Sequence, residues 1–394
     1  MTLHPSSLTP QPSRTIMIMA GGTGGHVYPG LAVANHLRAQ GWRIVWLGTK
    51  QGLEAKLVPA QDTEPAQGNE PAQRIEPAQR IEMVWLKFGG VRGKGVLRML
   101  WLPAQILLAF IQSARAIFKH RPDVVLGLGG YTAFPGGMMA SLFNRPLVIH
   151  EQNSIAGLTN RVLACLADRV LVAFPSAFQG PKDKPIPCGK VTAQCCGNPV
   201  RADIAGVPEP AARWQQRSGP LRLLVVGGSL GAQALNNAVP QALQLIDVAN
   251  RPAVVHQAGM QHLEQLQANY ASAGVQAELR AFIDDMAARY AWCDVVVCRA
   301  GALTIAELAA AGVASVLVPF PHAVDDHQTS NAMYLSAAGA AILLPQAELT
   351  PQKLAQLLGE FTREKLLAMA QQARALAQPD ATRAVADVCV RLAA

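Results

Sequence analysis

The sequence is poor in charged and aromatic residues. Only 15% of its 394 residues are Asp, Glu, Lys or Arg, 5% are Phe, Trp or Tyr, and 50% are hydrophobic. This composition excludes an intrinsically disordered chain and predicts globular domains, two of them at this length. The formal net charge of +8 favours anionic partners. Because no dense basic run is interleaved with aromatic residues, nucleic acid is disfavoured as a partner.

The seven cysteines follow no spacing typical of a zinc site. The nearest approach to a cluster is Cys188 with Cys195 and Cys196, and no histidine is close in sequence. We therefore expect reduced thiols, a cytosolic protein and no metal. The longest apolar stretch, 99–111, is too short to span a bilayer. Residues 1–14 lack the pattern of a signal peptide, and we expect them to form a disordered tail.

Glycine is abundant in three turns, each of which follows a short apolar strand-like run. A glycine turn between a strand and a helix lets the backbone approach a ligand closely. It also aims free N–H groups and the positive end of the helix dipole at an anion. Three such turns, divided between two halves of the chain, predict two domains that face each other across a phosphate-lined cleft. The turns are 21–26, 127–131 and 227–231.

Strand-like runs of Val, Ile and Leu alternate with helical segments along the whole chain. The runs are short and apolar on both faces, as buried parallel strands are. The pattern predicts an α/β fold with two Rossmann-like, doubly wound parallel-sheet domains. Proline and glycine are frequent in 178–220, which places the boundary there. We expect domains at 15–198 and 199–375, with a C-terminal helix in 376–394 that packs back on the first domain.

One low-complexity insert, residues 62–82, interrupts the first half. Glu-Pro-Ala-Gln occurs three times, starting at Glu64, Glu70 and Glu76. Because proline at every sixth position prevents a regular helix, we expect an exposed surface loop without chemistry. A partner-binding segment is the weaker alternative.

The first glycine turn does not fit a dinucleotide site. Val27 stands where the fingerprint has its third glycine, no acid follows the second strand, and no Gly-Lys-Ser/Thr is present. We expect a phosphate-binding turn without NAD or ATP hydrolysis, and no cofactor. His26 lies where the next helix starts. It is either a general base or a loop histidine bonded to backbone.

Polar residues follow three further strands, and each group has two interpretations. Residues 151–153 are either ligand contacts or a capped helix start. Thr304 and Glu307 form either a Thr-x-x-Glu capping box or a site where a helix start holds a diphosphate and the carboxylate accepts from ribose hydroxyls. Asp325 and Asp326 are more often caps than metal ligands. The basic and apolar segment 87–101 is either a membrane-interface patch or a core helix with a charged edge.

Several long motifs occur in order from about residue 15 to the C-terminus. They include GGTGGHVYPGLAVA, GLGGYTAFPGGMMA, HEQNSIAGLTNRVLA, FIDDMAARYAWCDVVVCRAGALTIAEL and PFPHAVDDHQTSNA. In these motifs the chain resembles the MurG family of GT-B glycosyltransferases. The resemblance implies a GT-B fold and inverting transfer of GlcNAc from UDP-GlcNAc to the C4 hydroxyl of MurNAc in lipid I, giving lipid II for peptidoglycan. It further implies a peripheral protein on the cytoplasmic face of the inner membrane, bound to anionic lipid through 87–101.

The resemblance also implies roles for individual residues. His26 matches the family's candidate base, and Gly129, Gly130 and Tyr131 lie on the acceptor side. Ile283 would read uracil through its backbone, and Glu307 would bind the ribose. The complete set implied for the donor is Thr23, Gly24, Gly25, Asn153, Arg201, Ser229, Ile283, Ala302, Leu303, Thr304, Ile305, Ala306, Glu307 and Gln328. The third turn departs from the family pattern, because Leu230 replaces a common Gln.

Two alternatives remain on the same fold. One is a UDP-GlcNAc 2-epimerase, which would need additional acids in the cleft and no membrane patch. The other is a non-catalytic UDP-sugar sensor, which would bind UDP-GlcNAc and leave it intact. Release of UDP that depends on an acceptor separates both from the transferase.

Overall fold

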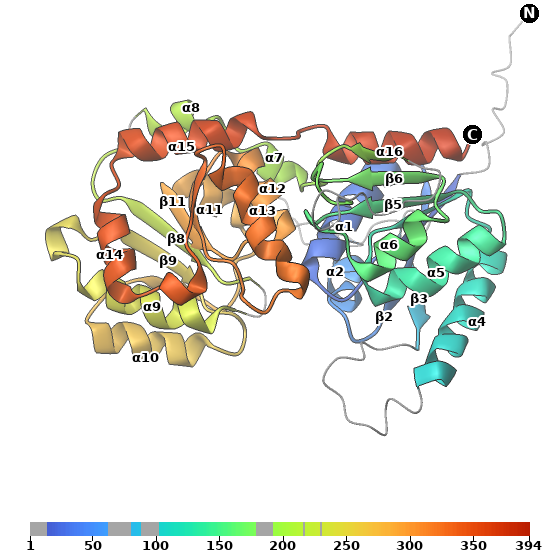
Figure 1. Ribbon diagram of the computed structural model, residues 1–394, viewed down its shortest axis with the longest axis horizontal. Helices are drawn as coiled ribbons and strands as arrows, with labels where there is room; N and C mark the ends of the chain where they lie inside the picture. Colours follow the sequence, from blue (N-terminus) through green and yellow to red (C-terminus); the bar gives the residue numbers. More distant parts are fainter. Residues whose placement is uncertain (1–13, 62–79, 88–101, 179–191, 216, 229–230) are drawn as a thin grey trace, which may run out of the picture.

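The computed structural model describes residues 14–61, 80–87, 102–178, 192–215, 217–228 and 231–394. It has two α/β domains, each built on one parallel sheet with helices around it (Figure 1). This architecture confirms the predicted pair of doubly wound sheets. Of the predicted features, residues 1–13 of the tail 1–14, residues 62–79 of the insert 62–82 and residues 88–101 of the patch 87–101 lie outside the described residues. Ser229 and Leu230 of the third turn also lie outside them.

The first domain holds a seven-stranded sheet in the order β3-β2-β1-β4-β5-β6-β7. Its strands are β1 (Thr15–Met19), β2 (Arg43–Thr49), β3 (Glu82–Leu86), β4 (Val124–Gly127), β5 (Leu147–Glu151), β6 (Arg169–Val172) and β7 (Ala193–Cys195). Its helices are α1 (Gly24–Ala39), α2 (Glu54–Ala60), α4 (Leu102–His120), α5 (Gly130–Leu142) and α6 (Leu158–Ala164). The insert is shorter than we expected, because Ile81 is buried and β3 begins at Glu82.

Alternation along β1 explains the two cores of the first domain. Ile16 and Ile18 pack on the face covered by α1, whereas Met17 and Met19 pack on the opposite face. All four side chains are fully buried. Successive side chains on a strand point to opposite faces, so a strand covered on both faces has to be apolar throughout.

The second domain holds a six-stranded sheet in the order β10-β9-β8-β11-β12-β13. Its strands are β8 (Arg222–Val226), β9 (Ala253–Gln257), β10 (Glu278–Arg280), β11 (Val295–Cys298), β12 (Ala314–Leu317) and β13 (Ala341–Leu343). Its helices are α7 (Ala202–Ala205), α8 (Pro210–Trp214), α9 (Gln233–Gln244), α10 (Leu263–Ala273), α11 (Met286–Trp292), α12 (Ala302–Ala311), α13 (His327–Ser336), α14 (Pro351–Gly359) and α15 (Arg363–Ala375). Short 3-10 turns are η3 (Val248–Asn250), η4 (Val324–Asp326) and η5 (Gln346–Glu348).

The last helix, α16 (Ala381–Leu392), leaves the second domain and lies across the first (Figure 1). Val385, Val388 and Cys389 join the core that contains β1 and α1. The chain thus passes between the domains twice, once before α7 and once before α16. Among the described residues, no helix is long and apolar enough to cross a membrane.

Sheet topology brings the glycine turns together. In each sheet the chain order reverses between two neighbouring strands, β1 and β4 in the first and β8 and β11 in the second. Ligands bind at the carboxyl ends of the strands beside such a reversal, because the loops there diverge and leave a crevice. The turns at 21–25 and 128–130 follow β1 and β4, and Gly227 and Gly228, the described start of the third turn, follow β8.

Candidate active site

A cleft of about 1740 Å³ lies between the two domains and is lined by both. Pockets for one small ligand are typically about 300–1,000 Å³, so this cleft has room for two substrates. Of the predicted residues, those that line it are Thr23, Gly24, Gly25, His26, Gly129, Gly130, Tyr131, Asn153, Arg201, Ile283, Ala302, Leu303, Thr304, Glu307 and Gln328.

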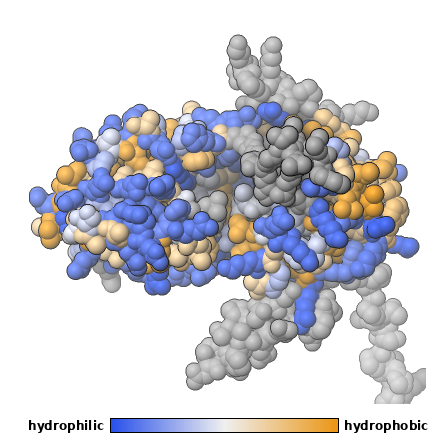
Figure 2. All heavy atoms as spheres, turned by 90° about the horizontal axis from the view of Figure 1, so that it is seen from below, coloured by the Kyte–Doolittle hydropathy of each residue, from blue (hydrophilic) through white to orange (hydrophobic). Residues whose placement is uncertain are grey.

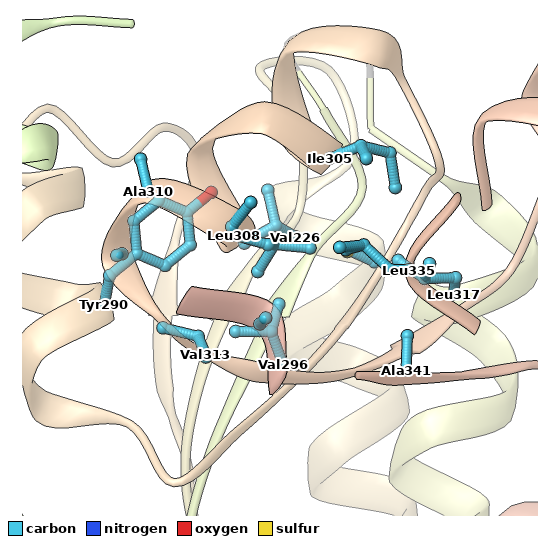
Figure 3. Packing of buried hydrophobic residues seen from close by; sticks show 14 of the residues in the cluster. Val226, Tyr290, Val296, Ile305, Leu308, Ala310, Val313, Leu317, Leu335 and Ala341 are labelled. Atoms are coloured by element: carbon cyan, nitrogen blue, oxygen red, sulfur yellow. The ribbon is translucent and has the colours of Figure 1, made fainter. Parts of the chain in front are cut away.

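Two of the predicted donor residues point away from the cleft. Ile305 is fully buried in the core of the second domain, where it points into the packed cluster (Figure 3). Ala306 lines a small cavity beside Asn198 on another side of α12. The resemblance implies donor contacts at every position from Ala302 to Glu307, and the side chains of Ile305 and Ala306 do not line the cleft. A helix turns about 100° per residue and presents only one face to the cleft.

His26 lies in the first turn of α1 and faces a polar side chain from another strand end. Its Nδ1 is 2.7 Å from Oε1 of Gln152, which follows β5. The only partner described for its ring is this side chain, so the alternative of a ring bonded to backbone is not what the structure shows. Gln152 is almost completely buried, and its Nε2 donates a hydrogen bond of 2.7 Å to the backbone oxygen of His150. Sequence analysis placed Gln152 in the polar group 151–153 but did not predict its contact with His26.

Glu54 is a residue that sequence analysis missed. It is a fully buried carboxylate beneath the first glycine turn. One oxygen accepts from the backbone N–H of Gly22 at 3.0 Å, and the other accepts from the N–H and hydroxyl of Thr49, each at 2.9 Å. The Thr49 hydroxyl lies 3.1 Å from that of Tyr131, which links the first glycine turn to the second. In the sequence, the only indication that Glu54 points inward is that it lies four positions before Val58, on the same face of a helix.

Replacing Glu54 with alanine should lower the free energy of unfolding by about 2–4 kcal/mol, because it leaves buried N–H donors without an acceptor. Urea denaturation measures this change. Glu264→Ala, an exposed acid near the start of α10, is the matched control and should have little effect. Equal midpoints for the two variants would contradict the bracing role of Glu54.

Glu307 lies on the opposite side of the cleft, on α12. The helix begins at Ala302 with Gly301 as its N-cap, so Thr304 is already inside it and the capping-box interpretation is wrong. Glu307 is only 8% exposed and accepts a 3.1 Å hydrogen bond from the Tyr290 hydroxyl. Burial raises the pKa of Glu307 to about 7, although nearby Arg201 opposes the shift.

Arg201 connects this carboxylate to the first domain. Its Nη2 is 3.8 Å from Oε1 of Glu307, and its guanidinium lies over the Tyr28 ring with Cζ 5.3 Å from the centroid. Its buried Nε has no hydrogen-bond partner among the described residues. A cation at this point can serve an anionic ligand in the cleft, since guanidinium groups suit phosphate oxygens.

Ile283 is held by a glutamine that sequence analysis also missed. The N–H of Ile283 donates to Oε1 of Gln257 at 3.0 Å, and Nε2 of Gln257 donates to the Gly228 oxygen at 2.9 Å. One buried side chain therefore sets the position of the predicted uracil contact relative to the third glycine turn. A base that uses the Ile283 N–H has to displace or share this bond.

Two asparagines tie the domains together. The Asn198 amide donates to the backbone oxygens of Gln152 at 3.0 Å and of Ala302 at 3.3 Å. Asn331 of α13 accepts from the N–H of Ser154 at 2.9 Å. The segment after β5 is consequently anchored to the start of α12. Asn153 lies in this segment, bonded to Glu151, and no helix begins there.

The acids after β12 behave as turn residues. Asp325 and Asp326 have φ angles of 53° and 51°, and Oδ1 of Asp326 accepts from the Thr329 hydroxyl at 2.7 Å. Asp326 holds the N-cap position of α13. Gln328 accepts from the N–H of Phe320 at 2.9 Å. Within the described ranges, no three His, Cys, Asp or Glu side chains group closely enough to hold a metal ion.

Comparison with known proteins identifies the family. Residues 16–172 match the glycosyltransferase family 28 N-terminal domain, and residues 222–387 match the C-terminal domain of the same family. A relative from Thiobacillus denitrificans is 60% identical over 381 residues, which is 97% of this chain and 99% of the relative. It is named UDP-N-acetylglucosamine--N-acetylmuramyl-(pentapeptide) pyrophosphoryl-undecaprenol N-acetylglucosamine transferase. The solved MurG of Acinetobacter baumannii is 40% identical, with a TM-score of 0.76 over 96% of this chain and 99% of that one.

The chain belongs to the MurG family. It is a glycosyltransferase with the GT-B fold. A UDP-GlcNAc 2-epimerase from Neisseria meningitidis is also similar in structure, with a TM-score of 0.60 over 96% of this chain and all of that one, but only 11% identity. That likeness shows a common fold alone, and the MurG relatives favour the transferase over the epimerase and the sensor.

Proposed function

We propose that the protein transfers GlcNAc from UDP-GlcNAc to the C4 hydroxyl of MurNAc in lipid I, with inversion at the sugar, and releases UDP and lipid II. The observation that carries this proposal is the near-complete match to a relative named for that transfer, at 60% identity. The cleft supports it, because His26 of the first domain and Glu307 of the second line the same space.

The donor is proposed to bind the second domain. The first N–H groups of α12, at 302–304, and its dipole favour the diphosphate. Glu307 accepts hydrogen bonds from the ribose hydroxyls, and the backbone of Ile283 pairs with uracil. Ser229 remains a predicted diphosphate contact outside the described residues. The remaining predicted contacts at the cleft keep the roles that the family resemblance implies.

The acceptor is proposed to bind the first domain, with its diphosphate on the turn at 129–131. His26 removes the proton of the C4 hydroxyl while that oxygen attacks C1 of GlcNAc. The bond from C1 to the phosphate oxygen breaks, and UDP leaves with the electron pair. Because attack and departure occur on opposite sides of C1, the product is inverted.

We propose residues 15–198 as the acceptor domain and 199–375 as the donor domain, with 376–394 returning to the first. Asn198 lies at this boundary and bonds backbone on both sides of the cleft. Closure about the two connections would exclude water and protect the donor from hydrolysis.

Membrane contact is proposed through 87–101 and the adjoining face of α4, on the cytoplasmic side of the inner membrane. α4 exposes apolar side chains, with Leu107 61% and Phe118 62% accessible. Figure 2 shows apolar residues gathered at the first-domain end of the molecule. Exposed Lys87 and Arg115 add positive charge. An apolar helix face with basic neighbours is typical of binding to anionic lipid.

A Leu107→Gln, Phe118→Gln double variant should bind phosphatidylglycerol vesicles at least about 10-fold more weakly, because two apolar side chains no longer enter the lipid. Vesicle sedimentation measures the effect. Val248→Gln is the matched control, since Val248 is 79% exposed on the second domain. Equal losses in both proteins would contradict the proposed membrane face.

The function itself is tested by UDP release from UDP-GlcNAc with and without a short-chain lipid I analogue. We expect release only with the analogue, together with a disaccharide product detected by mass spectrometry. Binding without release would indicate a sensor. Loss of UDP-GlcNAc without the analogue would indicate an epimerase or a hydrolase.

A further inference from the structure

We propose that Gln152 is a positioning residue that holds His26 in the tautomer protonated at Nδ1, leaving Nε2 free to accept the proton of the attacking hydroxyl. The inference rests on the proposed transfer reaction. It assigns a role to a side chain that acts through His26.

The orientation of the Gln152 amide follows from two backbone oxygens. Nε2 of His150 lies 2.9 Å from the oxygen of Gly197, which can only accept, so Nε2 of His150 carries a proton. Burial lowers the pKa of His150 to about 4, so the ring is neutral near pH 7 and its Nδ1 is an acceptor. The Gln152 amide nitrogen lies 3.0 Å from that Nδ1 and 2.7 Å from the backbone oxygen of His150. Both partners accept, which places the NH₂ group there.

The other end of the amide then sets the state of His26. Oε1 of Gln152 is an acceptor and lies 2.7 Å from Nδ1 of His26, so this nitrogen has to be the donor. A neutral imidazole carries one proton, and Nε2 is therefore the basic atom. The chain of bonds leads from Gly197 through His150 and Gln152 to His26. Only the His26 tautomer with its proton on Nδ1 gives every buried polar group in this chain of bonds a hydrogen-bond partner.

The surroundings of the ring suit this role. The two carbons that flank Nε2, Cε1 and Cδ2, face the turn at Gly129 and Gly130. A Cβ added to Gly129 would lie 3.3 Å from Cε1, and one added to Gly130 would lie 3.5 Å from Cδ2. Both glycines have positive φ angles, 92° and 75°. A side chain at either position would crowd the edge of the ring that has to meet the acceptor.

Gln152 is also firmly placed. It is 1% exposed, and Asn198 donates to its backbone oxygen at 3.0 Å. Holding a base with an amide orients it without placing a second charge in the cleft. After proton transfer, His26 becomes an imidazolium that still donates from Nδ1 to Oε1, and the amide dipole stabilises it.

The first measurement is the nitrogen-15 spectrum of the full-length wild-type protein labelled at histidine. The signals of His26 are assigned by their loss in His26→Gln. We expect a protonated, pyrrole-type shift at Nδ1 and a pyridine-type shift at Nε2 near pH 8. The opposite pattern, with the proton on Nε2, would overturn the proposal.

The second measurement compares two variants of similar size. Gln152→Met cannot accept from His26, and we expect kcat to fall about 10- to 100-fold with the KM for UDP-GlcNAc nearly unchanged, because the base loses its fixed tautomer. Gln152→Glu keeps an acceptor oxygen and should recover part of kcat and the Nδ1-protonated signal. Unchanged kcat in Gln152→Met, or equal losses in both variants with wild-type nitrogen shifts, would overturn the role.

The same assays separate this inference from the proposed function. Wild-type protein that releases no UDP with the lipid I analogue would remove the transfer reaction itself. Wild-type activity combined with an active Gln152→Met variant would remove only the role of Gln152. If Gln152→Met does not fold by circular dichroism, the wild-type nitrogen shifts decide the question.

Discussion

Replacing His26 with alanine is expected to lower kcat by about 10²- to 10⁴-fold, the range that a general base contributes. UDP affinity should change little, because the proposed donor contacts lie mainly on α12 and near Ile283. His26 lines the cleft and its ring is bonded only to Gln152 among the described residues, so its removal leaves one buried amide oxygen without a donor. Steady-state kinetics and calorimetry with UDP measure the two quantities.

His36 provides the control for this variant. It lies on α1 like His26 and is partly exposed, and Gln40, four residues later, is the only hydrogen-bond partner of its ring in the described part of the chain. His36→Ala should retain kcat. A His26→Ala protein with wild-type turnover would remove His26 as the base and direct attention to other residues at the cleft.

Glu307→Gln is expected to weaken UDP binding by about 10-fold, since a neutral amide accepts more weakly from the ribose hydroxyls than a carboxylate does. The amide oxygen can still accept from Tyr290, so the core shown in Figure 3 should persist. Calorimetry with UDP measures the affinity. In the wild-type protein affinity should also decline below pH 7, because the pKa of Glu307 is about 7 and protonation removes the negative charge that strengthens the hydrogen bonds from the ribose hydroxyls.

The same variant should stabilise the protein above neutral pH. Burial raises the pKa of Glu307 from 4.5 to about 7, so the unfolded chain loses this proton at lower pH than the folded chain does. Between these values the folded state binds more protons, and stability falls as pH rises. The loss, at most about 3 kcal/mol, is complete above pH 7 and is absent in Glu307→Gln.

Thermal unfolding between pH 5 and pH 8 checks the sign. The melting temperature of Glu307→Gln relative to wild type should increase with pH. Glu264→Gln, a change at an exposed acid of the same domain, should show no such trend. A difference between Glu307→Gln and wild type that is constant with pH would contradict the raised pKa.

Local patterns were sufficient for the sheets and for most of the cleft. Short apolar runs such as 223–226 identify buried parallel strands because both faces of each strand are covered. Glycine turns after those strands identify the ligand edge because parallel strands all end on one side of the sheet. Both regularities depend on residues that are close in sequence, so they can be recognised from composition and spacing alone. The resemblance to a known family added the substrates and the roles of single residues.

The contacts that position the site depend on residues far apart in sequence. Gln152 meets His26 across 126 positions, and Glu54 meets Gly22 across 32. The strand-end pattern at 151–153 marks Gln152 only as a member of a polar group, and no local pattern marks Glu54. An inward-pointing amide or carboxylate has the same spacing as one that faces water. The start of α12 at Ala302 likewise depends on how the loop after β11 packs. Because the helix begins there, Thr304 does not hold the N-cap position that a capping box needs, and Ile305 points into the core. Sequence patterns therefore predicted which strand ends and turns line the cleft, whereas long-range packing determined which buried polar groups hold His26, the first glycine turn and the proposed uracil contact in place.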